Sequence, residues 1–166
     1  MSHDITPKDA EDKLWKAIED SRFGMLSLDQ PGEHAQPMTA FCERVTGSLW
    51  FFTYRDSDLA REAGEGGMAA MFSFISKDQK VFACMAGRLH IHDDEGRKAR
   101  FWNPVVAAWY PEGRDDPRVC LMHMKLEDAR VWISEAGPIR FSYEIAKANL
   151  TDSRPDVGAQ ADIRFQ

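Results

Sequence analysis

The chain has 166 residues and a mass of 18.9 kDa, which fits one ordinary domain able to bury a core without disulfide or metal staples. Hydrophobic residues make up 43% of the chain and charged residues 29%, a composition typical of a globular protein rather than a disordered one. The net charge of −6 and the lack of a long basic run argue against general binding to nucleic acid or to anionic membranes.

The first predicted element is an amphipathic helix. Thr6 is a typical N-cap residue, Pro7 suits the first helical position, and apolar residues at helical spacing continue to about Arg22. Beyond this helix the hydrophobic period changes towards two, which indicates strands joined by tight turns. The predicted strands are Phe23–Leu28, Pro37–Val45, Ser48–Tyr54, Met68–Ile75, Val81–His92, Val119–Leu126 and Ala129–Ser134.

Two helical stretches interrupt this series of strands. Ser57–Ala63 is predicted to form a short helix capped by Asp56 or Ser57. Arg97–Trp109 is predicted to form a longer helix, which Pro104 must kink or split in two because proline removes a backbone donor.

The order of these elements predicts an α+β fold that is mainly β. Short strands that follow one another in hairpins favour a six-stranded antiparallel barrel with peripheral helices over a doubly wound parallel sheet. We expect one domain over residues 1–166, with its core at about residues 5–134. Residues 135–166 lose clear periodicity, so we expect a loosely ordered tail there.

The histidines form no clear metal site in the sequence. His90 and His92 share one face of a predicted strand and precede two aspartates, which could imitate a metal site. His34 and His123 stand alone, and no other histidine or cysteine has ligand-like spacing. We therefore interpret the pair as a solvent-facing strand end and expect no metal.

The cysteines also lack a catalytic context. All three lie in or beside predicted strands, where cysteine is usually a small core residue. Their wide spacing, with no hydrophobic stretch long enough to span a bilayer, predicts a reduced, cytoplasmic protein. These residues are Cys42, Cys84 and Cys120.

The junction between a strand and a helix is the best candidate for binding a ligand. The aromatic strand end Trp50–Thr53 runs into the predicted helix start at Ser57. Backbone N–H groups and a hydroxyl at such a junction commonly hold a phosphate. From composition alone, the same residues also describe a core strand followed by a capped helix.

Two groups of motifs resemble one known family. Gln36–Phe41 and Leu49–Thr53, with Ser57 four residues later, resemble the start of the flavin site in pyridoxamine 5′-phosphate oxidase-like proteins. Phe101–Pro104 and Ala108–Pro117 are similar to the Trp-Asn-Pro and Trp-Phe-Pro-x-Gly-x-Asp-Asp-Pro stretches of its bacterial general stress protein 26 branch. The order and spacing of these pieces together are specific to that branch.

The resemblance covers roughly residues 5–134 and implies an FMN-binding split barrel that forms homodimers, with flavin sites at the interface. FMN is the implied cofactor, with FAD as the alternative. By position, the isoalloxazine edge would lie beside Met38, Thr39 and Ala40. The ring and the ribityl-phosphate would lie near Phe52 and Thr53. The phosphate would face Ser57, and Trp109 would lie beside the flavin.

The chain departs from the family pattern where the phosphate would bind. Asp58 and Leu59 replace a basic pair common after the serine, and Cys42 replaces a lysine common at the end of the preceding strand. Because the surrounding stretch contains no lysine, we expect Arg55 and Arg61 to supply the positive charge for the phosphate.

The resemblance implies a flavin protein but not the parent oxidase activity. The chain has neither the Arg-x-His substrate element nor the Arg-Leu-x-Pro end of true pyridoxamine phosphate oxidases. The first hypothesis is a dimeric flavin-dependent oxidoreductase acting on an unknown small molecule, with no catalytic acid or base identified. The alternatives are a flavin-binding module without turnover, acting as a buffer or sensor in stress, and a split barrel whose site is empty or holds haem. Trp102, Trp109 and Tyr110 favour a homodimer, because one small barrel does not easily bury them all.

Overall fold

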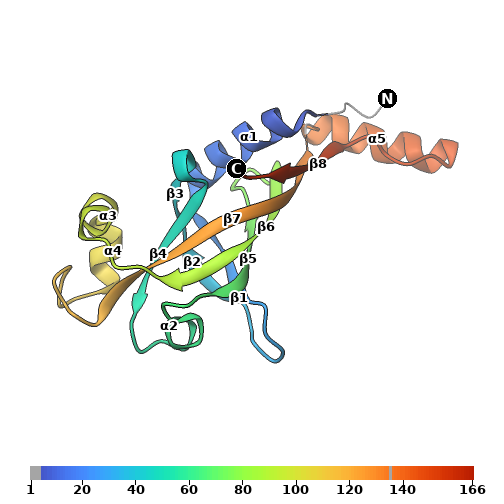
Figure 1. Ribbon diagram of the computed structural model, residues 1–166. Helices are drawn as coiled ribbons and strands as arrows, with labels where there is room; N and C mark the ends of the chain where they lie inside the picture. Colours follow the sequence, from blue (N-terminus) through green and yellow to red (C-terminus); the bar gives the residue numbers. More distant parts are fainter. Residues whose placement is uncertain (1–4, 135) are drawn as a thin grey trace.

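The fold is built around one curled antiparallel sheet, shown in Figure 1. The computed structural model describes residues 5–134 and 136–166, and the described residues form eight strands in this sheet. The strands are β1 (Phe23–Leu28), β2 (Gln36–Thr39), β3 (Phe41–Glu43), β4 (Ser48–Tyr54), β5 (Met68–Ile75), β6 (Val81–Ile91), β7 (Val119–Ser134) and β8 (Gly158–Arg164).

The strand order closes the sheet into a barrel. The order is β2-β1-β5-β6-β7-β4-β3, so β2 and β3 occupy its two ends. Only Ala40 separates these two strands in the chain, and it has no exposed surface. The ends of the sheet therefore meet at Ala40, which explains why the segment expected as the single strand Pro37–Val45 is two strands.

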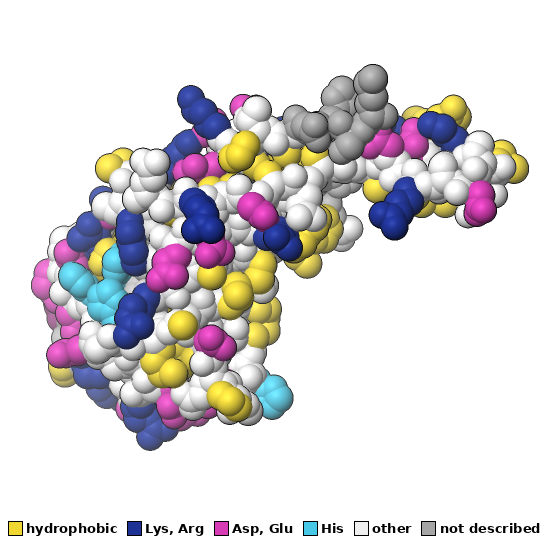
Figure 2. Space-filling model, turned by 45° about the vertical axis from the view of Figure 1, so that its right-hand side comes forward, with side chains coloured by type: hydrophobic (Ala, Val, Ile, Leu, Met, Phe, Trp, Pro, Cys, Tyr) yellow, Lys and Arg dark blue, Asp and Glu magenta, His cyan; other side chains and the backbone are white. Residues whose placement is uncertain are grey.

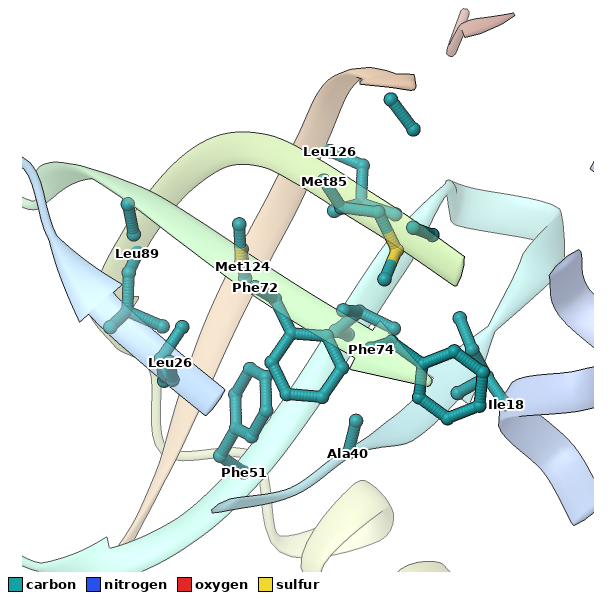
Figure 3. Packing of buried hydrophobic residues seen from close by; sticks show 14 of the residues in the cluster. Ile18, Leu26, Ala40, Phe51, Phe72, Phe74, Met85, Leu89, Met124 and Leu126 are labelled. Atoms are coloured by element: carbon teal, nitrogen blue, oxygen red, sulfur yellow. The ribbon is translucent and has the colours of Figure 1, made fainter. Parts of the chain in front are cut away.

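Apolar side chains that point inward from the strands fill the barrel interior. Figure 3 shows these side chains pointing toward one another from strands far apart in the sequence. Phe51, Phe72 and Met85 are completely buried there. Side chains alternate between the two faces of a strand, so β4 also has an outer face, where Trp50 and Phe52 belong to a second apolar cluster.

Helix α1 (Pro7–Ser21) forms where the sequence predicts an amphipathic helix, and its apolar side packs on the main core. The Thr6 side chain accepts a hydrogen bond from the Asp9 N–H, which confirms it as the N-cap, and Arg22 ends the helix in a left-handed conformation. The apolar stripe includes Leu14 and Ile18, both fully buried in the main core.

Three short helices flank the strands. Helix α2 (Asp58–Ala63) follows β4, and α3 (Glu95–Phe101) and α4 (Pro104–Trp109) lie over the outer side of β4 and β7 (Figure 1). Pro104 splits the stretch predicted as one helix, and the Asn103 side chain caps the second part. In the described part of the chain, no helix is long and apolar enough to cross a membrane.

The end of the chain is more ordered than expected. Residues Pro138–Thr151 form α5, which projects from the barrel in Figure 1, and β8 pairs with the second half of β7. Glu135, where the predicted tail begins, lies outside the described residues. β7 is also one continuous strand where two were expected, and the end of the chain joins the barrel sheet instead of forming a loose tail. The expected α+β fold, a mainly antiparallel barrel with peripheral helices, is confirmed, with more strands than the six expected.

We expect β8 to contribute to stability. Ile163 is 2% exposed and belongs to the main core, so Ile163→Ala should lower the free energy of unfolding by about 2–4 kcal/mol through lost burial and a cavity. Urea denaturation would measure this. The matched control is Gln160→Ala, an exposed position on the same strand that should change stability by less than about 0.5 kcal/mol. Equal stability of the two variants would contradict the packing of β8 on the core.

Candidate functional site

Two hydroxyl groups meet where β4 ends and α2 begins. The Thr53 hydroxyl donates a hydrogen bond to Ser57 Oγ at 3.0 Å, and the Ala60 N–H donates to the same oxygen at 3.2 Å. Ser57, one of the two predicted caps, is thus the N-cap of α2. Because Ser57 Oγ accepts both bonds, its own O–H remains available to donate to an incoming oxygen atom.

Both arginines expected at the phosphate are paired with carboxylates. Arg55 forms an ion pair with Asp93, and Arg61 forms one with Asp58. Arg55 Nε also donates to the carbonyl oxygen of Pro117 at 3.4 Å. All four charged side chains are more than one-third exposed, so solvent screens both pairs. The positive charge is present, but each guanidinium already faces one negative charge.

The residues expected beside the isoalloxazine edge lie at the open edge of β2. Met38 and Thr39 are half-buried on this end strand, which pairs only with β1. An end strand leaves backbone N–H and C=O groups available to another partner. The Ala40 N–H is already used, because it donates to the carbonyl oxygen of Arg22 at 2.7 Å.

The ring of Phe52 is enclosed by other aromatic rings of the chain. Its centroid lies 5.7 Å from that of Phe41, 5.5 Å from that of Trp102 and 6.3 Å from that of Tyr110. Burial raises the pKa of Tyr110 to about 12, so its hydroxyl stays protonated near neutral pH. This enclosure leaves the backbone of Phe52, rather than its ring, as the part that a ligand could reach.

The aromatic stretch that favours a dimer divides into buried and exposed residues. Trp102 and Tyr110 pack against the outer cluster within the same chain. Trp109 is 75% exposed, and Val105 on the same helix is 62% exposed. Of the three rings, Trp109 is therefore the one free to contact another molecule.

Cys42 brings no charge to the position where the sequence resemblance leads us to expect a lysine in the family pattern. Burial, together with the neighbouring Glu19 carboxylate, raises the pKa of the Cys42 thiol to about 11. Its Sγ lies 3.9 Å from Glu19 Oε1. The thiol is therefore neutral at physiological pH and cannot replace the lysine ammonium.

An ion-pair network that sequence reasoning does not predict holds α3 against the end of β3. Arg97 donates to both carboxylate oxygens of Glu43, at 2.8 and 3.1 Å, and to Asp94 at 2.8 Å. Arg100 also pairs with Glu43. Hydrogen bonding to Arg97, aided by Thr46 and Arg100, lowers the pKa of Glu43 to about 2. The partners are 54 residues apart in the chain, so no local sequence signal marks them.

The structure corrects the view of His123 as an isolated residue. His123 is the direct cross-strand partner of His90, and their ring centroids are 5.0 Å apart. His90 is half-buried rather than simply solvent-facing, whereas His92 is exposed.

Comparisons with known proteins agree with this architecture. A family model described as pyridoxamine 5′-phosphate oxidase like matches residues 9–156. A general stress protein 26 from Jannaschia sp. CCS1 is 35% identical in sequence and superposes with a TM-score of 0.82, covering 95% of this chain and 99% of its own. The chain therefore belongs to the pyridoxamine 5′-phosphate oxidase-like family, in its general stress protein 26 branch.

Other solved structures extend the comparison. The general stress FMN/FAD binding protein of Xanthomonas citri is 38% identical, with a TM-score of 0.72, and the match covers 78% of this chain and 92% of that one. A protein of the pyridoxinephosphate oxidase family from Clostridium acetobutylicum, 16% identical with a TM-score of 0.63, shares the split-barrel fold. The match covers 78% of this chain and 91% of that protein. A comparison with curated proteins gives no match.

We expect the contribution of Glu43 to stability to depend on pH. A carboxylate whose pKa falls from 4.5 to about 2 on folding stabilises the protein above pH 4.5, and this contribution is lost as the pH falls from 4.5 toward 2. At pH 7, Glu43→Gln should reduce the free energy of unfolding by about 1.5–3 kcal/mol, because charge-assisted hydrogen bonds are lost. Urea unfolding at a series of pH values should show the two proteins converging below pH 4.5. A difference that stays constant down to pH 3 would contradict the role assigned to this carboxylate.

Proposed function

We propose that this protein binds FMN, with the phosphate at the Thr53–Ser57 hydroxyl pair, and acts as a flavin-dependent oxidoreductase on a small molecule. The hydrogen-bonded hydroxyl pair is the observation that carries the proposal. The Xanthomonas citri relative, named as an FMN/FAD binding protein, supports flavin binding in this branch. FAD remains the alternative cofactor.

The Arg55 guanidinium can bind a phosphate at the hydroxyl pair if its side chain turns away from Asp93. Exposed ion pairs contribute about 0–1 kcal/mol, whereas charge-assisted hydrogen bonds contribute about 1.5–3 kcal/mol. A phosphate that carries nearly two negative charges therefore competes well with Asp93 for the Arg55 guanidinium. Arg61 is even more exposed than Arg55 and could turn from Asp58 in the same way.

The protein residues would orient the flavin and shield it from water. When bound, the flavin supplies hydride or electron transfer. The open edge of β2 at Met38 and Thr39 offers backbone groups to the ring edge, while Trp109 offers an exposed aromatic surface. The alternative of binding without turnover is supported by the relative's name, which mentions binding and no reaction. Adding NADH or NADPH to the flavin-loaded protein under anaerobic conditions would distinguish them, since an oxidoreductase that uses these donors bleaches the flavin absorbance.

We also propose a homodimer formed through the outer face of the sheet. Ile75, Phe82 and Trp132 are direct cross-strand neighbours on β5, β6 and β7, and their exposures are 56%, 37% and 42%. Phe23 and Met25 on β1 are also exposed. A contiguous apolar patch of this kind commonly marks an interface. The three free cysteines fit a reducing compartment, so we propose a cytoplasmic location.

The phosphate site predicts a selective effect on FMN. Arg55→Ala should weaken FMN binding about 10- to 100-fold, because one charge-assisted hydrogen bond to the phosphate is lost. Asp93→Asn should strengthen FMN binding, because it frees Arg55. Riboflavin, which has no phosphate, should respond little to either change, and quenching of flavin fluorescence measures both ligands.

The control for these variants is Arg164→Ala, which removes a remote exposed arginine and should leave FMN binding unchanged. Added salt should weaken FMN binding more than riboflavin binding. If Arg55→Ala, Arg61→Ala and the double variant all bind FMN as the unmodified protein does, the assigned phosphate site is wrong.

The proposed interface predicts a change in oligomeric state. Phe82→Glu places a charge in the centre of the apolar patch and should convert the dimer into monomers, because burying an unpaired carboxylate is costly. Sedimentation at micromolar concentration measures the mass. The matched control is Val45→Glu, since Val45 is 97% exposed and lies outside this face. A single-chain mass for the unmodified protein would rule out the dimer.

A further inference from the structure

Three histidine side chains meet on the outer face of the sheet. His90 and His92 lie on the same face at the end of β6, and the β6–β7 register places His123 opposite His90. The ring centroids are 5.0 Å apart for His90 and His123, 5.6 Å for His90 and His92, and 5.9 Å for His92 and His123. Histidine side chains accordingly gather at one place on the surface in Figure 2.

The hydrogen bonds around His123 leave one nitrogen lone pair unused. Ser48 Oγ lies 3.3 Å from the carbonyl oxygen of Thr46 and 2.8 Å from His123 Nε2, so a Ser48 hydroxyl that donates to Thr46 accepts from His123 Nε2–H. This tautomer puts the lone pair on His123 Nδ1, which is buried and has no hydrogen-bond partner. A buried acceptor without a protein partner is rare, and such an atom usually meets a water molecule or an ion. The Ser48 bond is the type of outer contact that fixes the orientation of a metal-binding imidazole.

The charges near the cluster are largely compensated. The Arg97 guanidinium lies 4.6 Å from the centroid of the Trp50 ring, which packs against His123, but it is paired with Glu43 and Asp94. Burial is the main reason that the pKa of His123 falls to about 4, and it also lowers the pKa of His90.

The ammonium and guanidinium groups of two further residues are held elsewhere. Lys125 donates to the carbonyl oxygen of Thr46, and Arg88 donates to the carbonyl oxygens of Gly66 and Gly67. These contacts direct both cationic groups to backbone oxygens rather than to the imidazole nitrogens.

We propose that His90, His92 and His123 form a binding site for one divalent transition-metal ion of the kind that prefers imidazole, such as Zn²⁺ or Co²⁺. Three imidazoles are a complete protein donor set for zinc, with the fourth position left to water or another small ligand. The site lies on the outer face of the sheet, whereas Thr53 lies on the opposite side of β4. It uses other residues than the proposed flavin site, but the two adjoin, because His92 directly precedes Asp93, the ion-pair partner of Arg55.

Binding requires two rings to turn. With the side chains as the structure places them, no group of three or more His, Cys, Asp or Glu among the described residues could hold a metal ion. The His90 and His123 rings meet edge to face, with an angle of 88° between their planes. Because His92 is exposed and His90 is only half-buried, both can change rotamer. The strand register keeps the His90 backbone in place, and the His92 N–H donates to the carbonyl oxygen of Leu121 at 3.0 Å.

Titration of the full-length, chelator-treated protein with Co²⁺ tests the proposal. One equivalent of Co²⁺ should produce the visible absorption of a cobalt ion with nitrogen ligands, and Zn²⁺ should displace it. His92→Ala removes an exposed ligand without opening the core, and it should weaken Co²⁺ binding at least about tenfold. Ser48→Ala should weaken it by about 10- to 100-fold, because the His123 ring loses its orienting contact.

The matched control is His34→Ala, which removes an exposed histidine from the β1–β2 loop and should leave Co²⁺ binding unchanged. Circular dichroism checks that each variant is folded. The proposal is overturned if the unmodified protein binds no stoichiometric Co²⁺, or if His92→Ala binds it as tightly as the unmodified protein. It is also overturned if His34→Ala weakens binding as much as His92→Ala does.

Discussion

β2 and β3 follow one another in the chain but lie at opposite ends of the strand order, with only Ala40 between them. Consecutive Cα atoms are about 3.8 Å apart, so the two end strands must approach each other within a few ångströms. The sheet therefore has to curl, and curling creates the enclosed interior that Phe51 and Phe72 fill. A residue larger than alanine at position 40 would have to displace this packing, since Ala40 has no exposed surface.

The same curvature gives β4 an inner and an outer face that serve different sites. Thr53 follows Phe51 by two residues and shares its face, while Trp50 and Phe52 lie on the outer face. Because the side-chain period of a strand is two, a shift of one residue would exchange these faces. The pairing of β4 with β7, from Ser48 to Tyr54, therefore determines which face carries Thr53 of the hydroxyl pair. It also determines which face carries Trp50, which packs against His123.

The features that could be predicted from the sequence are those that depend on residues close together in the chain. The Thr6 cap and the break at Pro104 depend only on neighbouring residues, and so does the hydroxyl pair at the end of β4. β8 escapes prediction because only two of its residues turn apolar side chains into the core, too few for a clear alternation. The contact between His90 and His123 depends on the register of two strands, which no periodicity in one sequence reveals.

The ion pairs of α3 have a consequence for Trp109. Arg97 fixes α3 to the end of β3, and Lys98 donates to the carbonyl oxygen of Val119 at the start of β7, so α3 is held at two points. The Asn103 cap then starts α4 directly after α3, and Tyr110 returns to the aromatic cluster. Trp109 is thus exposed, but the chain is held in place before it, by the contacts of α3, and after it, by the packing of Tyr110. The backbone that carries this ring is therefore held in place, which distinguishes Trp109 from an exposed residue on an unanchored loop.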